Sequence, residues 1–458
     1  MTARTYDVVV VGAGTGGCFA AATAADAGLE TVILERKTAE EAGHIACGDA
    51  IKGKSTFPDV IDREYLREEA FINQQIKGAV FENPASGDEI DIPFPEPGAV
   101  VDRRRYGEVL IEEAERLGTE FHYETVVQDV RQDEDGRVTG VRARRNGGTV
   151  DYEAEMTIDA AGALSILQDK TDLSGATFDT NVDYSQFCSA YREIVHVDDP
   201  VDWNDRIVFK PTDELGYLWY FPRTATEINA GLGFQMNKDP MKLVDVLKRD
   251  LESHPDLDDG RVTDKLGAAL PTRRPYDSAV APGFIAVGDA AGHVNPTTGG
   301  GIPGAAKAGH WGAQVAIDAI ADGSVDDERS LWEYNRRVMS TFGKRFAAMD
   351  LYNIWGGAHD VDELVSVVTA IPGQQLVDAL GRSGTSSMGL RLKLRTVLDT
   401  YGHWGLLREL YRVHRKATEL KDHYDAYPAS PAGFDAWQER RDGIMDDVYA
   451  IAGAEPKY

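Results

Sequence analysis

A glycine-rich turn between a buried strand and a helix, near the start of the chain, most restricts how this sequence can fold. Residues 8–11 are four valines, Gly12, Gly14 and Gly17 follow in the spacing G-x-G-x-x-G, and an alanine-rich helix is predicted over 19–27. In this spacing the first glycine permits the tight turn, the second lets backbone approach a pyrophosphate, and the third allows close packing of the helix. The sequence therefore predicts a Rossmann-type βαβ unit with phosphates at the helix N-terminus.

A carboxylate at the end of the second strand narrows the choice of nucleotide. Glu35 follows an apolar stretch over 31–34 and lies eighteen residues beyond Gly17, with Arg36 beside it. Its carboxylate can accept hydrogen bonds from both hydroxyls of an adenosine ribose and would repel a 2′-phosphate, which disfavours NADP. This first unit alone leaves NAD and FAD open.

A second glycine-rich segment decides between these two. Residues 283–288 form a short apolar strand, Asp289 stands at its end, and a further helix is predicted to begin near Ile302. A carboxylate at a strand end can bind the ribityl hydroxyls that FAD has and NAD lacks. Backbone N–H groups and the helix dipole can stabilise negative charge on a reduced flavin. The glycines that expose this backbone are Gly299, Gly300 and Gly301. We therefore expect FAD.

Charge and cysteine content exclude several other classes. The net charge of -28 disfavours general nucleic-acid binding. Carboxylates are abundant and 32 Arg outnumber 16 Lys, which predicts a salt-adapted cell, where a screening length of about 3 Å weakens repulsion between the carboxylates. An acidic enzyme from an ordinary cell is the alternative.

The sparse cysteines, Cys18, Cys47 and Cys188, predict a reducing cytoplasm and no metal site. Since no apolar run approaches the roughly 20 residues of a membrane span, we expect a cytoplasmic protein with a peripheral contact at the inner face of the membrane.

The order of these segments predicts an α/β protein with a Rossmann-type FAD-binding domain, an inserted antiparallel β-sheet substrate domain and a helical C-terminal region. Aromatic, β-rich composition between the two glycine-rich segments indicates the insertion. The expected parts are FAD-binding over 1–78, 101–175 and 275–340, substrate-domain strands over 79–100, a β-rich substrate domain over 176–274, and the helical domain over 341–458.

Two further motifs resemble those of the flavoprotein superfamily that includes aromatic hydroxylases, halogenases and geranylgeranyl reductases. Arg103 lies where that superfamily has an arginine touching the flavin nucleotide, although Gly107 replaces the acid often found after the aromatic residue. The segment from Asp159 through Gly162 resembles its short Asp-Gly motif in altered form. In hydroxylases this motif helps to receive NADPH, so its alteration weakens the case for direct nicotinamide use.

An aromatic motif gives the sharpest resemblance. Tyr217, Trp219 and Phe221, followed by Gly231 and Gly233, are similar to the Y-x-W-x-F-P and G-x-G signature of geranylgeranyl reductases. Alternation along a strand places the three rings on one face of a sheet, where they can form an apolar wall for an isoprenoid chain. Alternation alone favours ordinary core packing, and the glycine pair at the family's spacing reverses this preference.

A loop cysteine completes the expected site. Cys47 and Gly48 lie where reductases of this family carry a Cys-Gly pair near the flavin, and Cys47 and Tyr217 are the expected catalytic residues; a purely conformational role for Cys47 is the alternative. The expected FAD contacts are Gly12, Gly14, Gly17, Glu35, Arg36, Cys47, Gly48, Arg103, Val127, Asp159, Gly162, Asp289, Gly299, Gly300, Gly301 and Ile302.

These resemblances imply an FAD-dependent reductase that saturates the C=C bonds of geranylgeranyl chains on archaeal ether lipids, with electrons from an external donor such as ferredoxin. An electron-transferring flavoprotein dehydrogenase is the main alternative, although such enzymes commonly carry an iron-sulfur cluster on four clustered cysteines. An FAD-dependent monooxygenase or halogenase shares the fold, but the halogenase pattern W-x-W-x-I-P is absent from the sequence. A lipid-binding module without catalysis is a third possibility.

A basic segment stands out in this acidic chain. Between Arg391 and Lys416 there are seven basic and two acidic residues, which gives 7 − 2 = +5. We expect this segment to dock on anionic lipid headgroups or on an acidic ferredoxin; a solvated helix packed on the core is the alternative. The apolar residues expected to form a stripe beside the charges are Leu406, Leu407, Leu410, Tyr411 and Val413.

Overall fold

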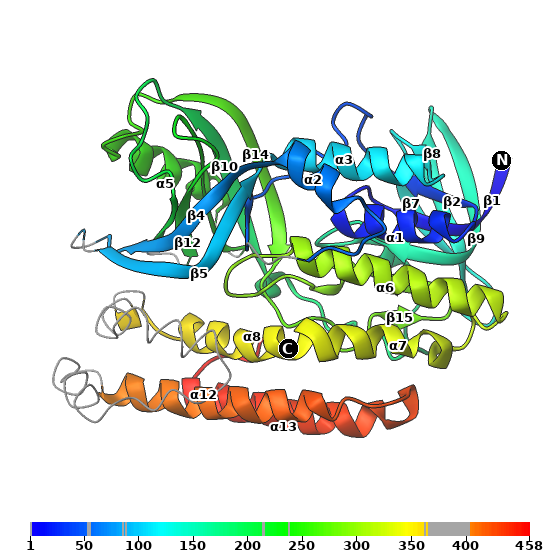
Figure 1. Cartoon of the computed structure of the whole chain (residues 1–458). Helices are drawn as coiled ribbons and strands as arrows, with labels where there is room; N and C mark the ends of the chain where they lie inside the picture. Colours follow the sequence, from blue (N-terminus) through cyan, green and yellow to red (C-terminus); the bar gives the residue numbers. More distant parts are fainter. Residues whose placement is uncertain are drawn as a thin grey trace.

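The computed structural model describes residues 2–52, 56–84, 87, 89–212, 216–236, 239–360, 363–364 and 404–458. Two eight-stranded sheets lie side by side, and a stack of long helices lies beneath them (Figure 1). This arrangement confirms the expected α/β class, with a mixed dinucleotide-type sheet, a separate largely antiparallel sheet and a helical C-terminal region.

The first sheet has a parallel centre built on the four valines. Val8–Val10 are fully buried and Val11 nearly so, as is typical of a strand covered on both faces. Two further strands extend the sheet by antiparallel pairing, β7 (Val126–Gln132) with β8 (Val138–Arg145), and β8 with β9. The order across the main path is β15 (Val280–Ala281), β16 (Phe284–Ala286), β9 (Gly148–Asp159), β1 (Thr2–Val11), β2 (Thr31–Leu34) and β6 (Glu120–His122).

Two helices of this part begin earlier than the apolar periodicity predicts, which is residue 19 for the first and residue 106 for the second. Helix α1 (Thr15–Asp26) already contains the third glycine of the motif, because the turn ends at Gly14. Helix α3 (Arg103–Arg116) begins at Arg103 because the side chain of Asp102 caps it. The backbone N–H groups of Arg104 and Arg105 donate hydrogen bonds to that side chain. Helix α1 packs on the first sheet, α3 packs on α1, and the short α2 (Arg63–Ala70) packs on α3.

The second sheet presents different side chains on its two faces. One face is covered by α5 (Pro240–Ser253), which packs against Leu218 and Tyr220. The other face carries Trp219 and Phe221. The strand order is β14 (Arg261–Pro271), β10 (Phe187–His196), β13 (Glu227–Gln235), β12 (Gly216–Pro222), β11 (Arg206–Thr212), β4 (Phe71–Glu82), β5 (Glu89–Val101) and β3 (Ala50–Ile51). The predicted alternation of the aromatic motif is therefore present on this sheet.

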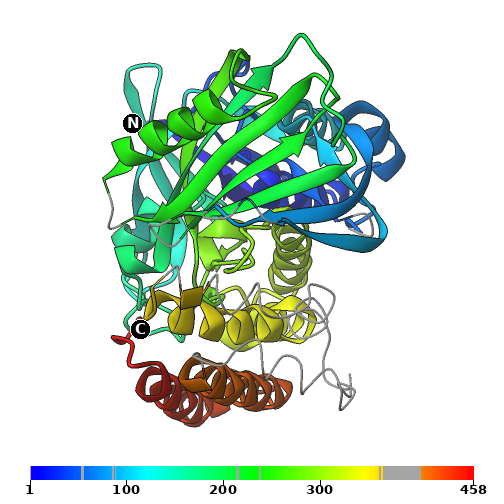
Figure 2. The same ribbon diagram turned by 90° about the vertical axis from the view of Figure 1, so that its left-hand side faces the viewer.

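The helices form successive layers below the sheets, as the turned view in Figure 2 shows. Helix α6 contacts α1 directly, α12 and α13 form the outermost layer, and α8 lies between. A π-helical turn over Met339–Gly343 joins α7 to α8. These helices are α6 (Ile302–Ala321), α7 (Glu328–Val338), α8 (Lys344–Gly357), α12 (Trp404–Asp425) and α13 (Phe434–Ala452). Across the described residues, none of the helices is both long and apolar enough to cross a bilayer.

A buried ionic network fastens the outer layer to the sheets. Asp277, which is fully buried, accepts hydrogen bonds from Arg274 at 2.8 Å, from Tyr424 of α12 and from Arg441 of α13. Tyr427 donates to its backbone carbonyl. One carboxylate thus joins three segments that are far apart in the sequence.

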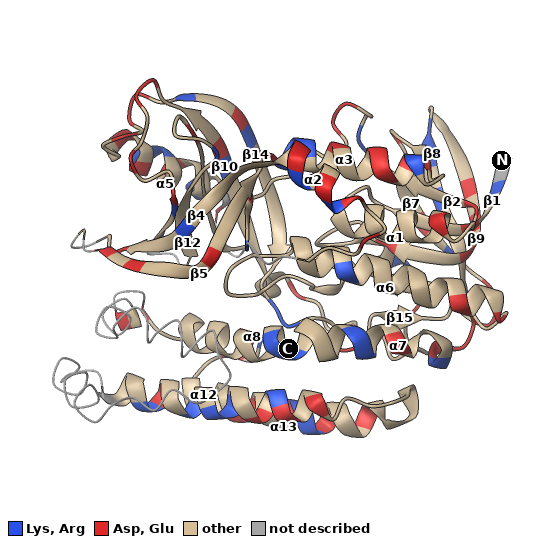
Figure 3. Cartoon of the chain, viewed as in Figure 1, with Lys and Arg blue, Asp and Glu red and all other residues tan. Residues whose placement is uncertain are grey.

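The basic segment is only partly described, since residues 391–403 lie outside the described ranges. In α12, Leu406 and Val413 are buried against the core, whereas Tyr411 is 63% exposed. The apolar stripe expected beside the charges therefore packs inward apart from Tyr411, because the helix needs that face to cover α8. In Figure 3 the ribbon of α12 carries several blue segments, which mark Lys and Arg.

Candidate active site

The first glycine loop has the geometry that its spacing predicts. Gly12 adopts φ 102°, and a Cβ there would lie 2.5 Å from the carbonyl oxygen of Ala160. A Cβ on Gly17 would lie 2.0 Å from the carbonyl oxygen of Gly12, so the helix can only approach the strand with glycine. Gly14 differs, because the nearest atom to its added Cβ is 3.9 Å away on Ile45. Gly14 therefore borders open space, where a pyrophosphate can approach.

Glu35, at the end of β2, lies against the first glycine loop. Glu35 is buried and accepts hydrogen bonds from the backbone N–H groups of Ala13 and Lys37, each at 2.9 Å. The N–H of Thr125 donates to the carbonyl oxygen of Glu35, which brings the strand containing Val127 beside it. Arg36 is exposed. These residues surround the end of the first unit where an adenosine would lie.

Arg103 provides the clearest sign that this cradle takes an anionic ligand. Its guanidinium is buried over the ring of Tyr106, and Nη2 donates to the hydroxyl of Thr15 at 3.4 Å. Its Nη1 is buried without a hydrogen-bond partner among the described residues. A buried, unpaired cationic donor is costly unless an acceptor arrives. The residues present therefore fit the diphosphate of FAD.

The second glycine segment lies against the same cradle. Asp289 stands in a short 3-10 turn over Gly288–Ala291, and burial raises the pKa of its carboxyl to about 6, against the opposing charge of Arg103. A Cβ on Gly301 would lie 3.5 Å from the carboxylate of Asp289. Helix α6 begins directly afterwards at Ile302, and Gly299 and Gly300 are exposed before it. The N-terminus of α6 thus faces the region between Asp289 and the glycines.

The altered Asp-Gly motif supports this second loop. Asp159 is fully buried and accepts hydrogen bonds from the N–H of Ala161 and the hydroxyl of Ser165. Gln168 donates to Asp159 at 3.0 Å and to the carbonyl oxygen of Ala290 at 2.7 Å. Gly162 has φ 85° and no atom within 4 Å of an added Cβ. Asp159 is thus held by its own loop and braces the turn that carries Asp289.

The Cys-Gly loop reaches across to the second sheet. A Cβ on Gly48 would lie 2.9 Å from the ring of Phe221 and 3.4 Å from the indole nitrogen of Trp219. Cys47 is partly exposed, and burial raises the pKa of its thiol to about 11, so the thiol is protonated at neutral pH. The path of this loop also requires Gly43 and Gly107, since a Cβ on Gly107 would lie 2.4 Å from the Cα of Gly43.

The aromatic wall connects the substrate sheet to the second glycine segment. The hydroxyl of Tyr217 donates to the carbonyl oxygen of Thr298 at 3.0 Å. Trp219 donates from its indole nitrogen to Asn229 at 2.9 Å and contacts the rings of both Tyr217 and Phe221. The structure therefore brings the Cys-Gly loop, the three aromatic residues and the glycine segment before α6 to one place, although the sequence separates them widely.

Gly231 and Gly233, the two glycines of the aromatic signature, differ in how closely other atoms pack against them. A Cβ on Gly231 would lie 2.4 Å from the indole of Trp219, whereas a Cβ on Gly233 meets nothing closer than 3.5 Å. We expect Gly231→Ala to displace the indole and lower substrate turnover by about tenfold or more, the scale of 1–3 kcal/mol of overpacking. Gly233→Ala is the matched control and should keep parental turnover. Equal turnover of the two variants, measured with lipid substrate, would contradict this assignment.

Two polar residues of this site, Asn229 and Asp49, belong to none of the sequence motifs. Asn229 donates to the carbonyl oxygen of Cys47 at 2.8 Å and to the carboxylate of Asp49 at 2.7 Å. Asp49 follows the Cys-Gly pair and Asn229 precedes the Gly231 signature by two positions, so only their proximity to those motifs could have suggested them.

Comparisons with known proteins agree with this geometry. A sequence model of the family described as FAD dependent oxidoreductase matches residues 7–214. The chain is 32% identical to digeranylgeranylglycerophospholipid reductase 2 of Methanopyrus kandleri, over 74% of this chain and 84% of that one. It is 25% identical to the digeranylgeranylglycerophospholipid reductase of Sulfolobus acidocaldarius, over 96% and 98%. The crystal structure of a geranylgeranyl bacteriochlorophyll reductase-like protein from Thermoplasma acidophilum superposes with a TM-score of 0.70 at 25% identity, covering 90% of this chain and all of that one.

Proposed function

This chain belongs to the digeranylgeranylglycerophospholipid reductases, which are FAD-dependent oxidoreductases, and from that premise we propose that it saturates the C=C bonds of geranylgeranyl chains on archaeal ether lipids. Its electrons come from an external low-potential donor, in keeping with the single dinucleotide fingerprint of the sequence. The substrate lies along the wall formed by Tyr217, Trp219 and Phe221.

The contact between the Cys-Gly loop and the aromatic wall carries this proposal. Gly48 has no side chain, so its backbone lies directly against Phe221, and Cys47 precedes it in the same loop. Tyr217 touches the loop that leads to α6. An isoprenoid chain laid along these rings would lie between the Cys-Gly loop and the loop that leads to α6.

The residues of the chain divide the chemistry with the cofactor. Bound FAD, once reduced, supplies the hydride for one alkene carbon. Arg103 and Gly14 hold its diphosphate, and Asp289 holds its ribityl chain. The aromatic wall excludes water and orients the alkene. Cys47 holds a proton on its sulfur for the other alkene carbon, because its raised pKa keeps the thiol protonated at neutral pH.

The direct test uses the whole protein purified in high salt. We expect a yellow protein with a flavin spectrum that bleaches with dithionite. Addition of unsaturated archaeal lipid should then restore the oxidised spectrum and add two mass units for each double bond reduced. A flavin that is reduced but leaves the lipid mass unchanged would point to the electron-transferring alternative.

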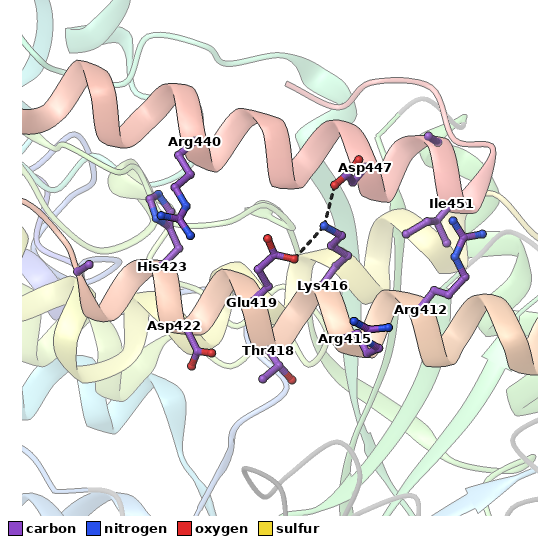
Figure 4. A pocket seen from close by; sticks show the side chains of 12 residues that line it. Arg412, Arg415, Lys416, Thr418, Glu419, Asp422, His423, Arg440, Asp447 and Ile451 are labelled. Carbon is purple, nitrogen blue, oxygen red and sulfur yellow. Dashed lines mark hydrogen bonds and ion pairs between the residues drawn. The ribbon is translucent and has the colours of Figure 1, made fainter.

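For the membrane contact we infer that α12 docks on anionic lipid headgroups. Arg408, Tyr411, Arg412 and Arg415 recur at helical spacing, and all four are exposed. Arg412 and Arg415 border a groove of about 670 Å³ between α12 and α13, where Lys416 pairs with Asp447 (Figure 4). Among the described residues the three arginines have no ionic partner, so their charge is available to a surface. An exposed tyrosine among arginines suits the headgroup region.

The triple substitution Arg408→Glu, Arg412→Glu and Arg415→Glu should weaken sedimentation with anionic vesicles by about 100-fold at low salt, since each basic residue near such a surface contributes about 1 kcal/mol. Dithionite-driven reduction of detergent-dispersed lipid should stay at the parental rate. Lys248→Glu, Arg249→Glu and Arg261→Glu make the same charge change on the α5 side and serve as the control. Unaltered vesicle binding with a loss of ferredoxin-driven turnover would assign the surface to the electron donor instead.

A further inference from the structure

Asp49 is a buried carboxylate close to Cys47 in the sequence and in the fold. It is 2% exposed and adopts φ 70°, a left-handed conformation that side chains rarely take. Its backbone N–H donates to the sulfur of Cys47 at 3.2 Å, so the two residues form one local turn. Glycine would adopt this backbone conformation without strain, yet the chain has an aspartate at this position.

The two oxygens of Asp49 differ in their partners. Oδ2 accepts the hydrogen bond from Asn229, whose other interactions tie it to Trp219 and to the carbonyl oxygen of Cys47. Oδ1 is buried without a hydrogen-bond partner among the described residues. An unpaired buried oxygen is tolerated best when it carries a proton or meets a ligand.

The charges around Asp49 come from three separate elements. Arg223 follows β12, Arg192 lies on β10 and Arg103 begins α3, and all three lower the pKa of the carboxyl. Burial outweighs them and raises that pKa to about 6. The ionised carboxylate in turn adds to burial in raising the pKa of the Cys47 thiol.

Resting on the reductase function proposed above, we propose that Asp49 is the acid that returns a proton to Cys47 after each double bond is reduced. One alkene carbon receives the hydride that reduced FAD supplies. The S–H bond of Cys47 breaks and its proton forms the C–H bond at the other carbon. The resulting thiolate takes the proton from the Asp49 carboxyl, which is recharged from water. The alkene gains two hydrogens, and the flavin loses two electrons.

This role gives the reaction a defined dependence on pH. The acid works only when protonated, so reduction by dithionite-treated enzyme should slow about tenfold per pH unit above about pH 6. The direction of proton transfer is favourable because the thiolate of Cys47 is the stronger base. Removal of a neighbouring positive charge should raise the pKa of Asp49 and move the fall in rate to higher pH.

Asp49→Asn is the main test, since asparagine tolerates the same backbone and its side-chain oxygen can still accept from Asn229. We expect kcat near pH 6 to fall about 100-fold with little change in KM, and the remaining activity to be independent of pH in this window. Arg223→Gln should keep activity and shift the fall in rate to higher pH. Asp250→Asn is the control, because Asp250 binds Tyr220 and Lys210 on the opposite face of the same sheet.

A second readout needs no turnover. Infrared difference spectra of the holoenzyme between about pH 5 and about pH 8 should contain a protonated-carboxyl band that Asp49→Asn removes. The comparison of the two proteins separates Asp49 from Asp159 and Asp289, whose pKa values are also raised by burial. If Asp49→Asn does not fold, the same band in the parent must shift with Arg223→Gln.

Parental rate and pH profile in Asp49→Asn, or a spectrum in which this band is absent or unmoved, would overturn the relay. A parent enzyme that reduces no double bond would instead defeat the proposed function, while the infrared band would still report the proton on Asp49. The two failures are therefore distinguishable.

Discussion

Replacing Cys47 with alanine is expected to lower the rate of alkene reduction by about 100-fold, the lower end of the range for loss of a positioned general acid. Cys47 precedes Gly48, which lies against the aromatic wall, and burial raises the pKa of the Cys47 thiol to about 11, so the thiol is in its proton-donating form throughout the neutral range. FAD binding should be unchanged, because Arg103 and the glycine loops hold the nucleotide. Mass analysis of the lipid after a fixed time measures the loss.

The substitution Cys47→Ser distinguishes the effect of losing the proton donor from the effect of changing the side-chain volume. The hydroxyl keeps a small donor at the same place, and we expect fewer double bonds to be reduced per lipid rather than none. Ser253→Ala is a suitable control, since Ser253 is exposed in α5, on the opposite face of the substrate sheet. If Cys47→Ala reduces every double bond at the parental rate, Cys47 has no chemical role.

Replacing Asp277 with alanine is expected to lower the free energy of unfolding by about 3–5 kcal/mol. The substitution leaves Arg274 and Arg441 buried without the carboxylate they share, and Tyr424 loses its acceptor. The outer helices α12 and α13 should loosen first, because Asp277 is their shared anchor. The midpoint of urea denaturation and the rate of proteolysis within these helices measure the two effects.

Glu134→Ala is the matched control for this experiment. Glu134 is an exposed carboxylate in the turn between β7 and β8, and its loss should change the unfolding free energy by less than about 0.5 kcal/mol. Similar midpoints for the two variants would show that the network around Asp277 contributes little to the stability of the outer layer.

Much of the cofactor half was predictable because its signals are local. The spacing of Gly12, Gly14 and Gly17 predicted a turn whose close contacts the structure shows. Periodicity placed the starts of α1 and α3 too late, because a glycine turn and the cap at Asp102, rather than apolar residues, determine them. The roles assigned to individual FAD and substrate contacts remain predictions.

The rest depended on contacts between distant segments. Alternation of Tyr217, Trp219 and Phe221 predicted a shared face, but not that Gly48 would lie against it. The sequence could not predict a role for Asp49 as an acid, since its hydrogen-bond partner Asn229 is 180 residues away. The apolar positions of α12 suggested a surface stripe, yet most of them cover the core, because a single helix gives no indication of what lies on either side.

The contact between Gly43 and Gly107 also limits how this chain can diverge. With a Cβ at position 107 only 2.4 Å from the Cα of Gly43, a side chain cannot enter α3 there while the loop keeps its path. A chain with an acid at position 107 would have to carry the loop along another path. Transplanting this loop would require residues 43–49 and the glycine at 107 to be inherited together.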